Sequence, residues 1–226
     1  MNTLILLHGA LGSASMFEKL IPYLQDEFTC IALDFPAHGN NAEMGEFTIQ
    51  AFAENLIAYI EQNHTQKVSV FGYSMGGYCA LYAASLRPDL FEKVMTLATK
   101  FAWSNEIAHK EMAMLDAEKM EAKIPEFVKQ LQQQHLHTHW KELVLQTTFL
   151  LRELGNHPLL TDDCLQSIRI PVRMVLGDHD QMVSIEETVH AYRQFQNGSL
   201  VILPNTKHPY EKVDTLMLAM QIIGFF

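Results

Sequence analysis

The sequence predicts an α/β fold: a doubly wound, mostly parallel sheet of about six strands that carries an all-helical lid insertion. Two observations support this, because short apolar runs recur along the chain and helical patterns lie between them. Most runs are continuous rather than alternating, which is typical of strands buried on both faces of a parallel sheet. The six runs are Thr3–Leu7, Thr29–Asp34, Lys67–Phe71, Lys93–Ala98, Val172–Leu176 and Leu200–Leu203.

Helices are predicted between these strands from capping residues and apolar spacing. Thr48 is suited to cap a helix whose apolar side chains share one stripe. The alanine-rich stretch Gly76–Leu86 stops before a proline, which is a common signal for a helix end. Ser184 opens a capping box, and we expect the helix that follows to reach about Phe195.

One stretch, residues 101–166, breaks this alternation. It contains no convincing strand, and helices are predicted at Glu106–Lys119, Pro125–Gln134 and Thr138–Leu154. We therefore predict a single domain, residues 1–226, with a helical insertion that forms a lid over the functional site. Most apolar side chains of the insertion are expected to pack in the core, and others to line a pocket.

Composition narrows the class of protein. The chain has 226 residues, 48% of them hydrophobic and 19% charged, as in ordinary globular proteins. The chain has 16 basic and 26 acidic residues, and the resulting net charge of −10 argues against a nucleic-acid partner. The first apolar run lacks a basic segment before it and is too short for a signal peptide or a membrane span, so we expect a cytoplasmic protein.

Three cysteines, Cys30, Cys79 and Cys164, are scattered along the chain in apolar segments. Their odd number and their surroundings predict three buried, reduced thiols rather than a disulfide framework. Reduced thiols fit the same reducing compartment.

A nucleophile elbow is predicted at residues 72–76, which read Gly-Tyr-Ser-Met-Gly. The segment follows a buried strand and opens a helix, and that context identifies the motif. Ser74 then occupies a tight, strained turn, and glycine at positions 72 and 76 removes side chains that would clash. The helix N-terminus also offers the backbone N–H of Met75 to a developing oxyanion.

The loop after the first strand, His8-Gly9-Ala10-Leu11-Gly12, is expected to complete this oxyanion hole. A loop at this place in such a fold supplies a second backbone donor, and we assign that role to the N–H of Ala10. We expect His8 to be a structural, hydrogen-bonded residue rather than an acid or base.

Two acids and one histidine complete the predicted catalytic group. Asp178 and Asp180 follow the run Val172–Leu176, and His208 follows Leu200–Leu203, so all emerge at the carboxyl ends of strands. The order serine, acid, histidine is the order of a triad in this class of fold. His208 would take the proton of Ser74, and the acid would orient the imidazole.

Other histidines receive structural interpretations. In the loop after the second strand, His38 is expected to organise a turn, and Asp34 to hold the loop through backbone hydrogen bonds. His135 and His139 are four residues apart and could share a helix face as metal ligands. No suitable third ligand accompanies them, so we expect a solvated part of the lid and no metal site.

Taken together, these motifs resemble the α/β-hydrolase superfamily over nearly the whole chain. The matching segments are His8–Gly12, Leu33–Gly39, Gly72–Gly77, Gly177–Asp180 and His208–Pro209. The resemblance implies that Asp180 is the acid of the triad and that Asp178 is structural. The chain departs from the family at Ala37, where members often have glycine. It also lacks the β-hairpin that usually precedes the oxyanion loop, which leaves six core strands instead of eight.

The expected activity is acyl transfer to water through an acyl-enzyme on Ser74, with a carboxylic ester or thioester as substrate and no cofactor. An alternative is a lyase or carbon–carbon hydrolase that uses the same triad, as in the SHCHC synthase of menaquinone biosynthesis. A third hypothesis is a non-catalytic binding module that keeps the pocket. A dedicated lyase should turn over a simple chromogenic ester poorly, and every expected triad position is filled, which argues against the binding module. The sequence leaves the substrate and the oligomeric state open.

Overall fold

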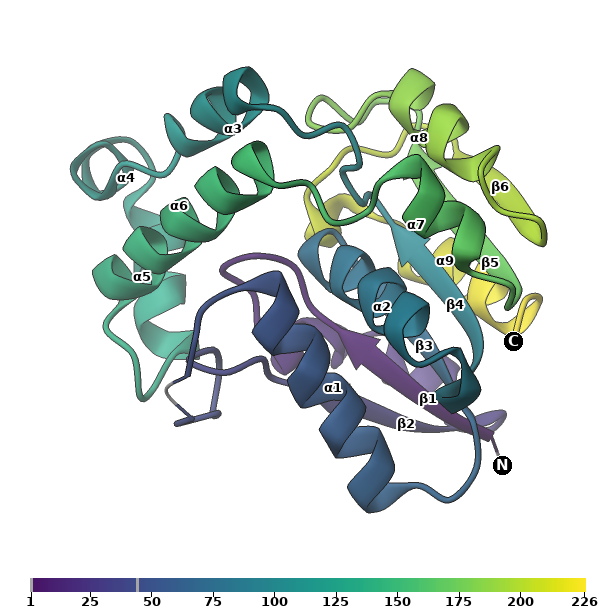
Figure 1. The fold of residues 1–226 in the computed structure, drawn as a ribbon. Coiled ribbons are helices and arrows are strands. Elements are labelled where there is room, and N and C mark those ends of the chain that lie inside the picture. The colour runs from purple at the N-terminus through teal and green to yellow at the C-terminus, as the bar shows by residue number, and fades with distance from the viewer. Residues whose placement is uncertain (1, 44) are drawn as a thin grey trace.

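A computed structural model describes residues 2–43 and 45–226 and arranges them around a six-stranded sheet (Figure 1). Its strands are β1 (Asn2–Leu7), β2 (Phe28–Leu33), β3 (Val68–Tyr73), β4 (Phe91–Leu97), β5 (Val172–Gly177) and β6 (Gly198–Leu203). They follow the order β2-β1-β3-β4-β5-β6, and every neighbouring pair is parallel. The predicted fold class is confirmed, and each strand begins and ends within two residues of its predicted run.

Helices and short turns cover both faces of the sheet. One face packs against α1 (Ile49–Asn63), α2 (Met75–Leu86), α7 (Asp162–Ser167) and α8 (Ile185–Tyr192). The other face packs against α9 (Thr215–Ile223) and the 3-10 turns Ala14–Phe17 and Ile21–Tyr23. The sheet is therefore doubly wound, with two apolar clusters separated by its strands.

The burial of β1 explains why the strands read as continuous apolar runs. Ile5 and Leu7 point into the cluster under α1 and α2, whereas Leu4 and Leu6 point into the cluster under α9. All four side chains are at most 1% exposed. A strand with two buried faces has no polar side to alternate with.

Between β4 and β5 the described residues form helices and no strand, as the prediction for this stretch requires. The helices are α3 (Asn105–Met112), α4 (Ala117–Lys123), α5 (Pro125–Gln134), α6 (Trp140–Asn156) and, at the end, α7. We call residues 101–166 the cap. In Figure 1, α3 to α6 stand beyond the carboxyl ends of the central strands.

Some helix boundaries were predicted wrongly. The expected single helix Glu106–Lys119 is two helices, because the side chain of Asp116 accepts the N–H of Lys119 and caps a new helix there. The helix that Ser184 opens through its capping box ends at Tyr192 rather than near Phe195.

Two of the contacts that join the cap to the body of the domain come from α6 and from the segment after it. The C-terminal half of α6 places Leu150 and Leu154 in the main apolar cluster, whereas its N-terminal half packs with the other cap helices. After α6, the N–H groups of Leu159 and Leu160 both donate to the buried hydroxyl of Tyr78 on α2, each at 3.0 Å. The cap is thus anchored directly behind the start of α2.

The remaining sequence expectations concern cysteines and membranes. Cys79 is buried as predicted, but Cys30 and Cys164 are only half-buried; all three are free thiols in the part of the chain described here. Among residues 2–43 and 45–226, the helices all fall short of the length and apolarity needed to span a membrane.

Candidate active site

Ser74 occupies the sharp turn between β3 and α2, with φ 50° and ψ −115°. Positive φ is rare for a residue with a side chain and marks backbone strain. The N–H of Ser74 donates to the carbonyl of Leu97 at 2.8 Å, and the hydroxyl of Thr99 donates to its carbonyl at 3.0 Å. A Cβ at Gly72 would overlap the backbone of Gly77, so this turn requires glycine there.

His208 and Asp180 form a close pair. The two residues come from the loops after β6 and β5, and His208 Nδ1 lies 2.8 Å from Asp180 Oδ2. The side chain of Asp180 is only 1% exposed, and its other oxygen accepts the N–H groups of Met182 and Val183 at 2.8 and 2.9 Å. A carboxylate held by two backbone donors is a fixed acceptor for an imidazole N–H.

Asp178 has a different environment. It is exposed, and its Oδ1 accepts the N–H of Thr206 at 3.1 Å. It therefore ties together the loops that carry Asp180 and His208. The structure brings Asp180, not Asp178, into contact with the histidine.

Tyr73 links the loop that carries His208 to the turn at Ser74. Its hydroxyl donates to the carbonyl of His208 at 3.0 Å, and the two rings lie 5.8 Å apart. Burial raises the pKa of Tyr73, and the nearby carboxylates of Glu211 and Asp180 raise it further, so the hydroxyl keeps its proton. Sequence reasoning missed this contact, because its partners are 135 residues apart and Tyr73 occupies a variable position of the motif.

The loop that carries Ala10 is a closed turn, in which the N–H of Gly12 donates to the carbonyl of Gly9 at 3.0 Å. Ala10 is exposed, and its N–H has no acceptor among the described residues. Met75 is the first residue of α2, where a backbone N–H has no partner within the helix. Their role as oxyanion donors stays a prediction.

Three histidines gather behind this turn. The ring centroids of His8 and His38 lie 4.9 Å apart, and those of His38 and His135 lie 5.8 Å apart. His8 Nε2 accepts the N–H of Phe35 at 3.2 Å, and its Nδ1 donates to the carbonyl of Gly9 at 2.8 Å. These contacts fix one neutral tautomer of His8 in a structural role.

Burial keeps this cluster uncharged. Desolvation lowers the pKa of His8 to about 4, and it lowers that of His38 well below its ordinary value, with the neighbouring His8 adding to the effect. His38 Nδ1 donates to the carbonyl of Pro36 at 3.0 Å, which organises the turn, while Nε2 is buried without a partner among the described residues. Desolvation also lowers the pKa of His135.

The prediction that His135 lies in a solvated part of the lid is wrong. His135 is 4% exposed; its Nδ1 accepts the N–H of Gly39 at 2.9 Å, and its Nε2 donates to the carbonyl of Leu11 at 3.1 Å. His139 is exposed and caps α6. The two histidines lie in the connection between α5 and α6, so they share no helix face.

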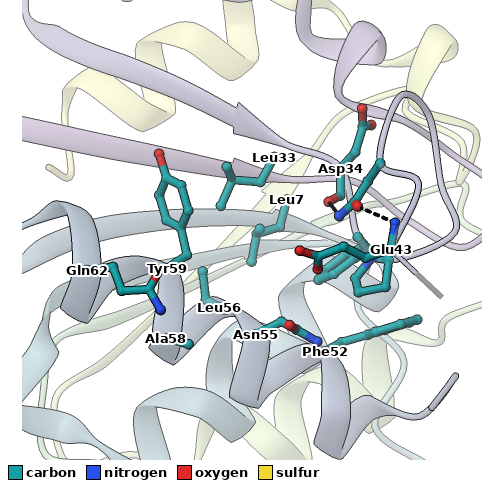
Figure 2. A pocket seen from close by; sticks show the side chains of 13 residues that line it. Leu7, Leu33, Asp34, Glu43, Phe52, Asn55, Leu56, Ala58, Tyr59 and Gln62 are labelled. Atoms are coloured by element: carbon teal, nitrogen blue, oxygen red, sulfur yellow. Dashed lines mark hydrogen bonds between the residues drawn. The ribbon is translucent and has the colours of Figure 1, made fainter. Parts of the chain in front are cut away.

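Asp34 holds the loop after β2, as predicted. Its carboxylate accepts the N–H groups of Ala14 at 2.6 Å and Asn40 at 3.0 Å. A cavity of about 270 Å³ lies beside it, between the end of β2 and α1, and its lining side chains are drawn in Figure 2. Neither Ser74 nor His208 lines this cavity, so it is separate from the elbow.

The apolar residues predicted for the cap have three different environments. Trp140 and Leu143 are buried inside the cap itself, and Phe101 and Trp103 pack against the main core. Others are exposed: Met114, Phe127 and Phe149. Phe101 and Trp103 lie nearest in sequence to Thr99, whose hydroxyl contacts the carbonyl of Ser74.

Comparisons with known proteins agree with this architecture. The family described as alpha/beta hydrolase fold matches residues 2–156. YugF, an uncharacterized hydrolase of Bacillus subtilis, is 39% identical over 100 residues, which are 43% of this chain and 37% of that protein. The chain spans about a third of the length of this and two further curated relatives.

Other relatives align over most of the chain. A pimeloyl-(acyl-carrier protein) methyl ester esterase of Neisseria meningitidis is 26% identical over 224 residues, 90% of this chain and 84% of that protein. The crystal structure of NosK from Streptomyces actuosus has a TM-score of 0.84 at 20% identity and covers 99% of this chain and 96% of that one. At that identity, NosK shares the fold.

The buried histidines predict acid sensitivity. Because folding lowers their pKa values, the unfolded chain binds more protons below about pH 6.5, and stability falls as the pH is lowered further. His8 alone should cost about 3 kcal/mol of unfolding free energy between pH 7.5 and its native pKa of about 4. His38, His135 and the carboxylate of Asp34 lie near it. The negative charge of Asp34 opposes the lowering of the pKa of both His38 and His135. Urea titrations at several pH values measure this loss.

A matched pair of variants isolates the cluster from other titrating groups. His135→Gln should flatten the dependence of unfolding free energy on pH, whereas His137→Gln, in the exposed part of the same connection, should leave it unchanged. Parallel curves for both variants would contradict the assignment.

Proposed function

The chain belongs to the α/β-hydrolase-fold family, and from that premise we propose that it is a serine hydrolase that cleaves a carboxylic ester or thioester. The observation that carries the proposal is the His208–Asp180 pair, tied through Tyr73 to the strained turn that presents Ser74. A nucleophile on a strained turn, together with a histidine oriented by a buried carboxylate, is suited to acyl transfer.

The proposed reaction has two steps. Ser74 Oγ attacks the acyl carbonyl while His208 Nε2 takes its proton, and Asp180 holds the Nδ1–H of the resulting imidazolium. The N–H groups of Ala10 and Met75 stabilise the oxyanion of the tetrahedral intermediate. His208 then protonates the departing alcohol or thiol, which leaves an acyl group on Ser74. Water, activated by the same histidine, releases the acid and restores the free serine.

The named relatives favour an ester as the substrate. The Neisseria meningitidis protein that aligns with 90% of this chain is named a methyl ester esterase, and that name describes hydrolysis of an ester. The same steps hydrolyse a thioester, so both substrate classes belong in the test.

We expect Ser74→Ala to abolish hydrolysis without unfolding the protein. Loss of the nucleophile from a triad that acts as a unit costs several orders of magnitude in kcat. The measurement is hydrolysis of 4-nitrophenyl esters and acyl thioesters, with labelling of wild-type Ser74 by an organophosphonate as a direct check. Ser85→Ala, at the far end of α2, serves as the control and should keep full activity. Full activity in the Ser74 variant would rule out the mechanism.

The two acids should differ sharply. Asp180→Asn replaces the partner of His208 Nδ1 and favours the wrong imidazole tautomer, so kcat should fall by about 10⁴-fold. Asp178→Asn keeps an oxygen for the N–H of Thr206 and should change kcat little. Steady-state kinetics with circular dichroism of both variants compare the two losses. Equal losses, or the reverse order, would mean that the acid is misassigned.

We assign acyl selectivity to the start of the cap. The N–H groups of Phe101 and Ala102 donate to Glu187 Oε1 at 3.0 and 3.2 Å, and Trp103 Nε1 donates to the carbonyl of Lys100 at 3.2 Å. These bonds hold two large, half-buried rings on the segment that leaves β4 beside Ser74. A fixed aromatic wall at this place suits an acyl chain, and the cap would then act as a lid.

Trp103→Ala should therefore reorder the preference for acyl length. One methylene in an apolar pocket is worth about 1–3 kcal/mol, so an enlarged wall shifts the optimum toward longer or bulkier acyl groups. The measurement is kcat/KM for 4-nitrophenyl esters of graded chain length. Phe149→Ala, on the exposed side of α6, is the matched control and should keep the wild-type ranking. An unchanged ranking in the Trp103 variant would locate selectivity elsewhere.

A further inference from the structure

Leu11 lies in the loop that carries Ala10, but its backbone is strained and its side chain packs against the cap. It is the third residue of the turn closed by Gly9 and Gly12, and its φ is 59°. Glycine or asparagine usually occupies a turn position with positive φ, and a leucine there is an outlier that calls for compensation.

The compensation comes from the side chain of Leu11. It is 7% exposed and lies inside the apolar cluster of the cap. The other buried members of that cluster all come from the cap: Met120, Val128, Leu131, Trp140, Leu143 and Val144. A single residue of the loop is thus enclosed by α4, α5 and α6.

His135 holds the same residue through its backbone. Its Nε2 donates to the carbonyl of Leu11 at 3.1 Å, and its Nδ1 accepts the N–H of Gly39 at 2.9 Å. The N–H of Leu136 also donates to the carbonyl of Gly39, at 3.2 Å. The cap therefore contacts the loops after β1 and β2 at one point, with the side chain and the carbonyl of Leu11 both occupied.

We propose that Leu11 and His135 are positioning residues through which the cap holds the oxyanion loop in its active conformation. The inference rests on the proposed function, since Ala10 supplies the donor. The N–H of Ala10 lies between the carbonyl of Gly9, which His8 and Gly12 hold, and the peptide of Leu11, which the cap holds. Fixing both sides of Ala10 fixes the direction of its N–H.

This arrangement makes the cap part of the chemistry as well as of substrate binding. If the cap shifts away from the body, Leu11 loses its apolar surroundings and its carbonyl loses a donor. Nothing then offsets its positive φ, and the turn relaxes. The oxyanion donor is therefore competent only when the cap is seated, so contacts between a substrate and the cap act on kcat and not only on KM.

The decisive variant is His135→Leu, which removes both side-chain hydrogen bonds of His135 and fills the buried position with an apolar side chain. Because loss of an oxyanion donor costs about 10²–10³-fold in kcat, partial misplacement should lower kcat at least about tenfold with little change in KM. Binding of an alkyl trifluoromethyl ketone, which forms a tetrahedral adduct, should weaken by a similar factor. His135→Gln keeps a donor for the carbonyl of Leu11 and should recover part of both losses.

His137→Leu is the matched control, since His137 is exposed two residues away, and it should behave as wild type. Amide hydrogen exchange of residues 8–14 should be faster in His135→Leu and in Leu11→Ala, and it needs no substrate. Unchanged kcat, inhibitor affinity and exchange in the folded His135 variants would overturn the proposal. A wild-type chain that hydrolyses no ester or thioester would overturn the proposed function instead, while the exchange measurement still tests the contact.

Discussion

The reversal of the chain at Ser74 is the constraint on which the arrangement of the site depends. A residue with φ 50° at this position costs of order 1–3 kcal/mol and persists only where its surroundings allow no alternative. Here the end of β4 and the residues that follow it supply that restraint, because the carbonyl of Leu97 accepts the N–H of Ser74 and the hydroxyl of Thr99 donates to its carbonyl. The turn also lies against β1, where a Cβ at Gly76 would overlap the carbonyl of Leu7. The three central strands together fix the position of this half-buried serine at the carboxyl ends of the strands.

The parallel sheet brings the other groups to the same edge. Ala10, Asp180 and His208 follow β1, β5 and β6, and the carboxyl ends of parallel strands lie side by side. Strand β3 contributes twice, since the side-chain hydroxyl of its last residue, Tyr73, contacts His208 and the chain then continues into Ser74. The loops are then fixed by short polar contacts between them, such as that of Asp178 with Thr206.

Local signals in the sequence were enough for the strands and for the strand–turn–helix arrangement around Ser74, whereas the catalytic roles of Ser74, Asp180 and His208 stay predictions. Each of these signals lies within one short segment, such as the continuous apolar run of β1 or the glycines around Ser74. The single helix predicted at Glu106–Lys119 failed, because apolar spacing runs across Asp116 and does not show that its side chain caps a new helix.

Contacts between distant segments could not be predicted in the same way. The pairing of His135 with Leu11 spans 124 residues, and that of Tyr73 with His208 spans 135. The sequence around His135 or Tyr73 contains no local pattern that predicts which residue it contacts. His135 even lies in a histidine-rich segment that favours a solvated or metal-binding interpretation, and only its burial between two loops shows its structural role.

Backbone strain in the described residues is concentrated at the edge of the sheet that carries the site. The non-glycine residues with positive φ are Leu11, Ala37, Ser74, Ala98 and Asn205, and each follows the carboxyl end of a strand. A hairpin turn or a helix end would normally place glycine at such positions. The chain keeps side chains there, and at Leu11 the side chain is what joins the loop to the cap. In the proposed mechanism, strain and function coincide at Leu11 and Ser74 for a physical reason. These two turns hold unusual conformations beside the groups that would contact the substrate, and the buried strands supply the stability that offsets the cost.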